Sequence, residues 1–125
     1  MGIHSDIARL HQKIRECEED ISELEEAREF LRQKLTIIQD EAYEPAKNFD
    51  ITCGEQFRGK IEEKAEDARY DITARTEICQ NATLEFVSQI DVTIERLREM
   101  ICEYESEIDR LEEELRSREL SQNRE

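Results

Sequence analysis

The stretch 45-PAKNFDITCGEQFRG-59 decides the fold of this 125-residue chain. It holds the only proline of the sequence and every glycine except Gly2. Proline and glycine disfavour helices more than any other residues, so the chain has one natural break with a long uninterrupted stretch on either side. The fold class predicted from this pattern is all-α: an antiparallel two-helix hairpin, or coiled coil, with a longer second helix.

Local signals around the break predict where the two helices begin and end. Proline disfavours helical geometry in the residue before it, so the first helix should stop near Tyr43 or Glu44. Thr52 and Glu55 have the spacing of a capping box, which opens a second helix. Together they predict one helical-hairpin domain over residues 1–125, with a first helix at about 5–43, a connection at about 44–52, a second helix at about 53–119 and a frayed tail at 120–125.

The composition excludes several classes of partner. The chain has 18 basic against 33 acidic residues and a net charge of -15, whereas binding to nucleic-acid phosphates requires clustered Lys and Arg. The same charge disfavours an anionic membrane surface, and no run of about 18 apolar residues is present to insert into a bilayer. Because the N-terminus does not resemble a secretory signal peptide, a cytoplasmic location is expected.

The first stretch carries one heptad seam, in which apolar residues recur in alternating steps of three and four. Arg28 is the single residue that interrupts it, and its long stem can stay in the seam while its charged head reaches solvent. The apolar seam positions are Ile7, Leu10, Ile14, Cys17, Ile21, Leu24, Leu31, Leu35, Ile38 and Ala42.

The second stretch has two apolar registers. Its first half is thinly apolar, with Arg75 out of pattern among Ile61, Ala65, Ala68, Ile72, Cys79, Ala82 and Phe86. From Val87 onward a richer heptad begins, displaced by one residue from the register that contains Phe86. This displacement predicts that the contact stripe of the second helix rotates near Phe86.

The helix lengths predict an overhang. If Ala42 faces the start of the second helix, Ile7 lies opposite roughly residue 90, because both helices rise about 1.5 Å per residue. The second helix would then continue for some 25 residues, about 38 Å, and would need another partner. The predicted partner interface, through which the hairpin would also oligomerise, is Ile94, Leu97, Ile101, Tyr104, Ile108, Leu111 and Leu115.

A kink is the alternative to this overhang. If the second helix bent sharply near Phe86 and folded back, the chain would form a three-helix bundle. No Gly or Pro lies between Ala82 and Ile94 to cause such a bend, and sharp kinks usually have an identifiable cause. The straight extension is therefore the favoured interpretation.

The inventory of reactive side chains argues against an enzyme. His4 and His11 are the only histidines, and no glycine-rich phosphate loop occurs, although catalysis requires convergent reactive groups. The four cysteines form no Cys-x-x-Cys pair, and the acidic runs lack the alternating ligands and glycine of a calcium loop. No catalytic residue, metal site or cofactor is predicted, and the cysteines are expected to be reduced thiols.

The residues after the break carry a family resemblance. Phe57-Arg58-Gly59-Lys60 resembles a variant of the Trp-x-Gly motif of small helical-hairpin proteins associated with type VII secretion, with Phe57 in place of Trp. Together with Glu44-Pro45, the Phe49-Asp50-Ile51-Thr52 approach and the long acidic second helix, it makes the chain similar to the YwqH-like family of Firmicutes. That family is found beside toxins that carry an LXG domain.

The resemblance implies a helical adaptor or chaperone that binds the helical LXG region of a toxin and supports its type VII secretion. Phe57 and Gly59 are the residues that match the family motif. Secreted type VII substrates usually carry Tyr-x-x-x-Asp/Glu, whereas Tyr104 is followed four residues later by Ile108. The resemblance therefore implies an adaptor that relies on the toxin, or on a second small helical protein, for the export signal and either stays in the cytoplasm or is co-exported.

Two alternatives remain open at this stage. Gly within a helix costs about 1 kcal/mol relative to Ala, so Gly59 is expected to allow a close backbone approach while Phe57 fills the end of the hairpin; both could also merely close the hairpin. For the chain as a whole, the alternative is a general coiled-coil dimerisation scaffold that forms a homodimer and has no toxin partner.

Overall fold

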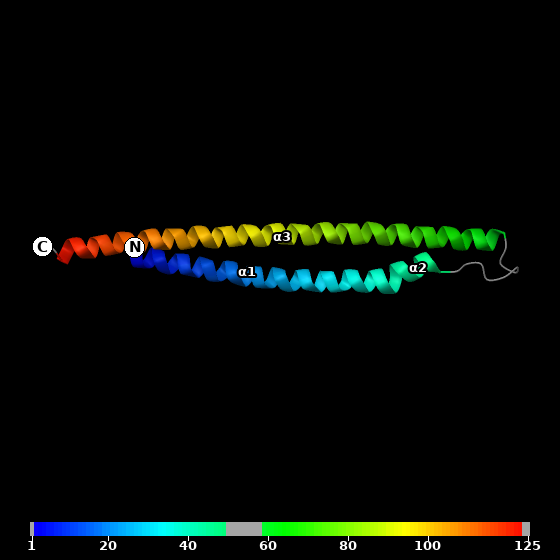
Figure 1. Cartoon of the computed structure of the whole chain (residues 1–125), viewed down its shortest axis with the longest axis horizontal. Helices are drawn as coiled ribbons and strands as arrows, with labels where there is room; N and C mark the ends of the chain where they lie inside the picture. The colour runs from blue at the N-terminus through cyan, green and yellow to red at the C-terminus, as the bar shows by residue number, and fades with distance from the viewer. Residues whose placement is uncertain (1, 50–58, 124–125) are drawn as a thin grey trace. The chain divides into compact units, whose positions relative to one another are not determined.

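The structure is a computed structural model that describes residues 2–49 and 59–123. All secondary structure in this described part is helical. Along the chain (Figure 1), the elements are α1 (Ile3–Ile38), a π-helical turn η1 (Gln39–Tyr43), α2 (Glu44–Asn48) and α3 (Lys60–Asn123). The predicted all-α class with a longer second helix is confirmed.

The helical run does not stop at Pro45 as predicted. Proline lacks an amide and crowds the carbonyl four residues earlier in an α-helix. In η1 the helix is widened, because the amide of Glu44 donates to the carbonyl oxygen of Gln39, five residues earlier. Pro45 therefore fits in the first turn of α2, and the run ends only where Phe49 adopts an extended conformation with ψ of 126°.

The start of the second helix also differs from its prediction. Gly59 lies directly before α3 and has a φ of +90°, so no helix runs through it. The predicted start near Cys53, with its Thr52 capping box, lies outside the described residues. At its other end α3 continues to Asn123, past the predicted end at residue 119. It passes Phe86 without interruption, which excludes a helix that folds back there.

The structure divides into two compact units. The terminal unit comprises Met1–Glu26 and Ile90–Glu125, and the middle unit comprises Ala27–Gln89. Both α1 and α3 contribute residues to each unit, whereas η1 and α2 belong to the middle unit.

The terminal unit is built on an apolar core in which the start of α1 (blue in Figure 1) lies beside the C-terminal part of α3 (orange), whose red end projects past it. Leu10 and Ile14 of α1 pack with Ile108 and Leu111 of α3, and all four side chains are buried. Ile94 of α3 is only 1% exposed. These contacts pair the two helices in an antiparallel arrangement and confirm the predicted hairpin.

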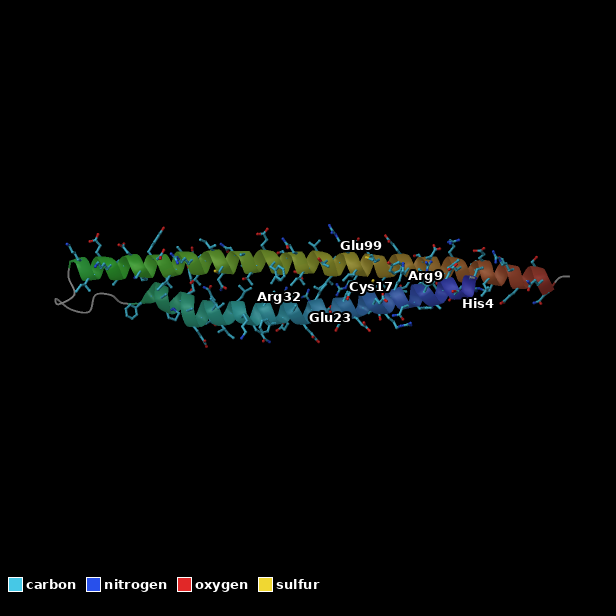
Figure 2. The ribbon with its side chains drawn as sticks, turned by 180° about the vertical axis from the view of Figure 1, so that it is seen from behind. His4, Arg9, Cys17, Glu23, Arg32 and Glu99 are labelled. Carbon is cyan, nitrogen blue, oxygen red and sulfur yellow. The ribbon has the colours of Figure 1, made fainter. Side chains whose placement is uncertain are left out.

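Cys17 lies on the inner side of α1 in this unit. Figure 2 shows it on the side that faces α3, whereas Glu23 and Glu99 point away from the paired helix. Burial, together with the nearby Asp20, raises the pKa of the Cys17 thiol, which keeps it protonated at neutral pH. Its predicted position on the seam is confirmed.

The predicted overhang of α3 is wrong. Ile7 packs against the apolar core that contains Ile108, instead of lying opposite residue 90. The prediction assumed that the chain reverses soon after Ala42, whereas the helical run continues to Asn48. The hairpin therefore closes later in the sequence, and the seam of α3 has a partner within its own chain as far as Leu115. Only residues 116–123, which are all exposed, extend past the start of α1.

The middle unit is held together differently. Among its described residues only Val87 is a buried hydrophobic side chain. Polar groups join its two helical arms: Gln80 Nε2 donates to the carbonyl oxygen of Leu35 at 3.0 Å, and the Tyr43 hydroxyl donates to the Glu77 carboxylate. Its arms are therefore paired with little apolar burial.

We expect Ile94→Ala to lower the free energy of unfolding by about 2–5 kcal/mol, because it leaves a cavity at a fully buried position. The matched control is Val92→Ala, since Val92 is 52% exposed two residues earlier on the same helix, and its effect should stay within about 0.5 kcal/mol. Urea unfolding followed by far-UV circular dichroism at one protein concentration measures both. Equal losses would show that Ile94 is not in a packed seam.

Candidate partner-binding face

The contact seam of α3 in the middle unit is polar. Its half-buried residues and the buried Val87 follow one heptad spacing: Arg69, Thr73, Thr76, Gln80, Thr83 and Val87. In the terminal unit the same spacing continues at Ile90, Ile94, Leu97, Ile101, Tyr104, Ile108, Leu111 and Leu115. The predicted rotation of the contact stripe near Phe86 is therefore wrong, because the residues that face α1 stay in a single register.

All seven residues of the predicted partner interface lie on this contact seam. Ile94, Ile108 and Leu111 are buried. Ile101 and Tyr104 pack against the apolar core of the terminal unit, and the remaining two, Leu97 and Leu115, are half-buried. The structure thus brings these residues together, but against α1 of the same chain, and the apolar surface left for a partner lies elsewhere.

The apolar residues in the first half of α3 lie beside the contact seam. Ala68, Ile72, Cys79, Ala82 and Phe86 each precede a seam residue by one position, and all are exposed. One residue corresponds to a turn of about 100° around an α-helix, so this stripe runs along the edge of the seam. Cys79, which was predicted to lie on a seam, is therefore solvent-accessible.

The other arm shows the same displacement from Ile38 onward. The half-buried seam residues are Leu31 and Leu35 of α1 and Gln39 and Tyr43 of η1, and the residues directly before them, Phe30, Lys34, Ile38 and Ala42, are exposed. The sequence predicted Ile38 and Ala42 on the seam. The π turn adds one residue to the helical repeat, which moves Gln39 and Tyr43 inward and Ile38 and Ala42 to the surface.

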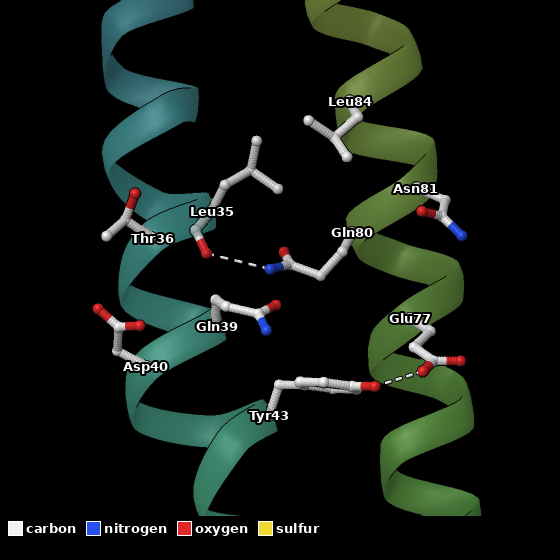
Figure 3. A pocket seen from close by; sticks show the side chains of 9 residues that line it. All are labelled: Leu35, Thr36, Gln39, Asp40, Tyr43, Glu77, Gln80, Asn81 and Leu84. Atoms are coloured by element: carbon white, nitrogen blue, oxygen red, sulfur yellow. Dashed lines mark hydrogen bonds between the residues drawn. The ribbon is translucent and has the colours of Figure 1, made fainter.

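Residues from both helical arms share one face of the middle unit. In an antiparallel helix pair, the residues one position after each seam residue lie on the same side of the pair in both helices. The residues one position before each seam residue lie on the opposite side. The first side is visible in Figure 3, where Thr36 and Asp40 line one hollow with Asn81 and Leu84. The opposite side, hereafter the apolar face, consists of Phe30, Lys34, Ile38, Ala42, Ala68, Ile72, Arg75, Cys79, Ala82 and Phe86.

A hollow adjoins the apolar face where α2 meets α3. It has a volume of about 250 Å³ and is lined by Ala46, Phe49, Ala65, Ala68, Arg69 and Ile72. Phe30, Ile72 and Phe86 are 58%, 53% and 54% exposed, which is unusual for large apolar side chains gathered on one face. Such a patch marks a protein interaction surface more often than an ordinary surface.

The charges on the apolar face differ from those of the chain. Its only charged residues are Lys34 and Arg75, although the whole sequence is strongly acidic. Lys34 Nζ lies 5.3 Å from the centre of the Phe30 ring, and Arg75 Nη2 lies 3.3 Å from the Asp71 carboxylate. The face is therefore apolar with a basic component.

The opposite side of the middle unit is lined mostly by polar residues, with Leu84 exposed among them. Figure 3 shows Tyr43 and Gln80 reaching between the two arms above a hollow of about 460 Å³. The hydrogen bond to Glu77 raises the pKa of Tyr43. A raised pKa means that the protonated tyrosine stabilises the folded state. This contribution is fully present below the ordinary pKa of tyrosine and is lost as the pH rises through the raised pKa of the folded state. At neutral pH this contact supports the π turn.

We expect Glu77→Gln to lower the pKa of Tyr43 toward its ordinary value, because a neutral amide favours the protonated phenol less than a carboxylate does. The pH titration of the Tyr43 ring, followed by NMR, measures the change. Tyr70 is the internal control, since it is 75% exposed and lies two helical turns before Glu77 on the same helix. An unchanged Tyr43 titration would show that the two side chains do not pair in solution.

Gly59 has a role different from the predicted one. A Cβ added at this position would meet nothing within 4 Å, so close backbone approach is not the reason for the glycine. Its φ of +90° lies in the region that side chains disfavour, and its carbonyl accepts the amide of Glu63 at 3.0 Å. Gly59 thus allows the backbone to enter α3, while Phe57 lies outside the described residues.

We expect Gly59→Ala to lower stability by about 1 kcal/mol and Gly59→Asn to lower it less, since Asn tolerates positive φ better than Ala. Thermal unfolding of both variants at equal concentration makes the comparison. A larger loss for Asn than for Ala would favour close approach over backbone conformation, because Asn is the larger side chain.

The described residues contain no group of three or more His, Cys, Asp or Glu side chains placed to hold a metal ion. Cys79 and Cys102 are free and exposed. In the part of the chain that the structure describes, no helix is both long enough and apolar enough to cross a membrane.

Comparison with known proteins gives one match. A family model described as YwqH-like matches residues 2–119, almost the whole chain. No curated protein and no solved structure matches the sequence or the fold.

Proposed function

Because the chain belongs to the YwqH-like family, we propose that it is a non-catalytic helical adaptor or chaperone that binds the helical LXG region of a toxin and supports its type VII secretion. It acts in the cytoplasm, where it meets the toxin before export, and it either stays there or leaves with its cargo. A second small helical protein is a further partner of the same assembly. It needs no cofactor.

The observation that carries this proposal is the apolar face of the middle unit. Phe30 and Ile38 from one arm and Ile72 and Phe86 from the other present apolar side chains on one face, and each of these side chains is at least 40% exposed. A face of this kind accepts an amphipathic helix that supplies the missing third side of a bundle. A helical toxin region provides such a helix.

The proposed surface differs from the one expected from sequence. Residues Ile94 to Leu115 already pack on α1, so acidic substitutions there would unfold the terminal unit and would say nothing about a partner. Substitutions on the apolar face change side chains that are exposed in the free chain. They test binding without removing a buried contact.

We expect the wild-type chain, co-expressed with the LXG domain encoded next to it, to co-purify as a stable complex. Ile72→Asp and Phe86→Asp should each abolish the complex, because a carboxylate would have to be buried without a partner. Leu84→Asp is the matched control, since Leu84 is 53% exposed and lies on the polar side of the same helix. Size-exclusion chromatography of the co-expressed proteins measures all four.

Three outcomes separate the candidate functions. A complex that survives both Ile72→Asp and Phe86→Asp would contradict the apolar face as its binding surface. The absence of any complex with the wild-type chain would contradict the adaptor function. The alternative, a homodimerisation scaffold, predicts instead that the isolated chain is a dimer by light scattering and becomes a monomer with the same two substitutions.

A further inference from the structure

Arg75 is placed where a bound helix would cover it. Within the apolar face it stands one turn after Ile72 and one turn before Cys79, in the middle of the exposed stripe of α3. Its side chain is 79% exposed, so the guanidinium stays hydrated while the face is open to water. A helix docked on Ile72 and Phe86 would remove much of that water.

A covered arginine needs an anionic partner. Removing a guanidinium from water is unfavourable unless charge and hydrogen bonds replace the lost solvation. Asp71 supplies part of this, through one nitrogen of Arg75 at 3.3 Å. A guanidinium has five N–H donors, so further donors can pair with a second carboxylate from the opposite side of the interface.

We infer that the helix bound by the apolar face carries a carboxylate within its own apolar stripe and that Arg75 pairs with it, which fixes the register of the docked helix. The inference rests on the proposed function in one respect, because it requires that a helix binds this face. A single polar pair in an apolar heptad is a common way to set alignment between helices. The occupant is thus an amphipathic helix of another protein with one Asp or Glu among its seam residues.

A second copy of the chain fits this face less well. Its own apolar face would present Arg75 and Lys34 again and offer no carboxylate from its seam-edge positions. Acids that adjoin the face lie one position further from the seam, among them Asp71 and Glu85 on α3, and Glu29 and Glu41 on the other arm. Asp71 is already engaged with its own Arg75. Charge complementarity therefore favours an acidic helix over self-association.

Two synthetic peptides test the inference without the toxin. Both have about four heptads with the same leucine stripe, and they differ only at the central stripe position, which is Glu in one and Lys in the other. We expect the Glu peptide to bind the full chain at least about tenfold more tightly than the Lys peptide, by isothermal titration calorimetry. Arg75→Glu should reverse this preference, whereas Arg75→Lys should keep its direction and reduce its size.

The matched control is Arg116→Glu. Arg116 is 68% exposed in the terminal unit and pairs with Glu113 at 3.4 Å, so its reversal changes the net charge equally but should leave the preference between the peptides unchanged. Repeating the titration at about 0.5 M salt removes long-range attraction. A preference that persists there comes from direct pairing at Arg75.

Each remaining outcome overturns one specific claim. Equal affinity for the two peptides, or a preference that Arg75→Glu does not reverse, would overturn the carboxylate pairing. If neither peptide binds, or if the chain buries this face in a homodimer, docking of an acidic helix there is wrong. Binding of the Glu peptide with no binding of the LXG domain would instead overturn the proposed function and leave the pairing intact.

Discussion

The rest of the structure depends on the packing of Leu10 and Ile14 against Ile108 and Leu111. Fully burying an aliphatic side chain is worth about 1.5–3 kcal/mol, and this is the richest apolar heptad in the sequence. Once it is used inside the chain, the end of α3 has no apolar stripe left for a partner. The consequence is that any helix-binding surface must come from apolar residues that the hairpin itself does not bury.

These unburied apolar residues occur because α3 carries apolar residues in two heptad registers, whereas it contacts its neighbouring helix along a single stripe. From Val87 onward, apolar and contact stripes coincide. Before it, they are one residue apart, so Thr76 and Gln80 face the other arm while Ile72 and Phe86 face solvent. In the other arm, Ile38 and Ala42 are offset in the same way at the π turn, whereas Phe30 precedes the seam residue Leu31 without any offset. Apolar side chains of both arms therefore reach one face.

The sequence predicts the helical class, the longer second helix and the seam position of Cys17, because these follow from helix breakers and heptad spacing. It does not predict how the arms align. Apolar periodicity shows that a stripe is buried against something, but not against what, and the usual rule for proline gave no sign that a π turn would carry the helix through Pro45. The displacement between Phe86 and Val87 was visible in the sequence. It predicts a rotation of the contact stripe towards another partner, whereas the earlier stripe is the exposed one, along Ile72 and Phe86.

The polar seam of the middle unit also bears on what binding would do. Gln80 joins the arms through a hydrogen bond to Leu35, whose net contribution is about 1 kcal/mol, whereas the seam threonines donate to carbonyl oxygens of their own helix. This unit therefore gains less from its own packing than the terminal unit does. A helix docked on the apolar face would touch both arms at once and would stabilise only the paired state. Binding free energy is then added directly to the stability of the paired arms. The unit with the weaker seam is the one with the open face, and the proposed partner helix would supply there the apolar burial that the hairpin lacks.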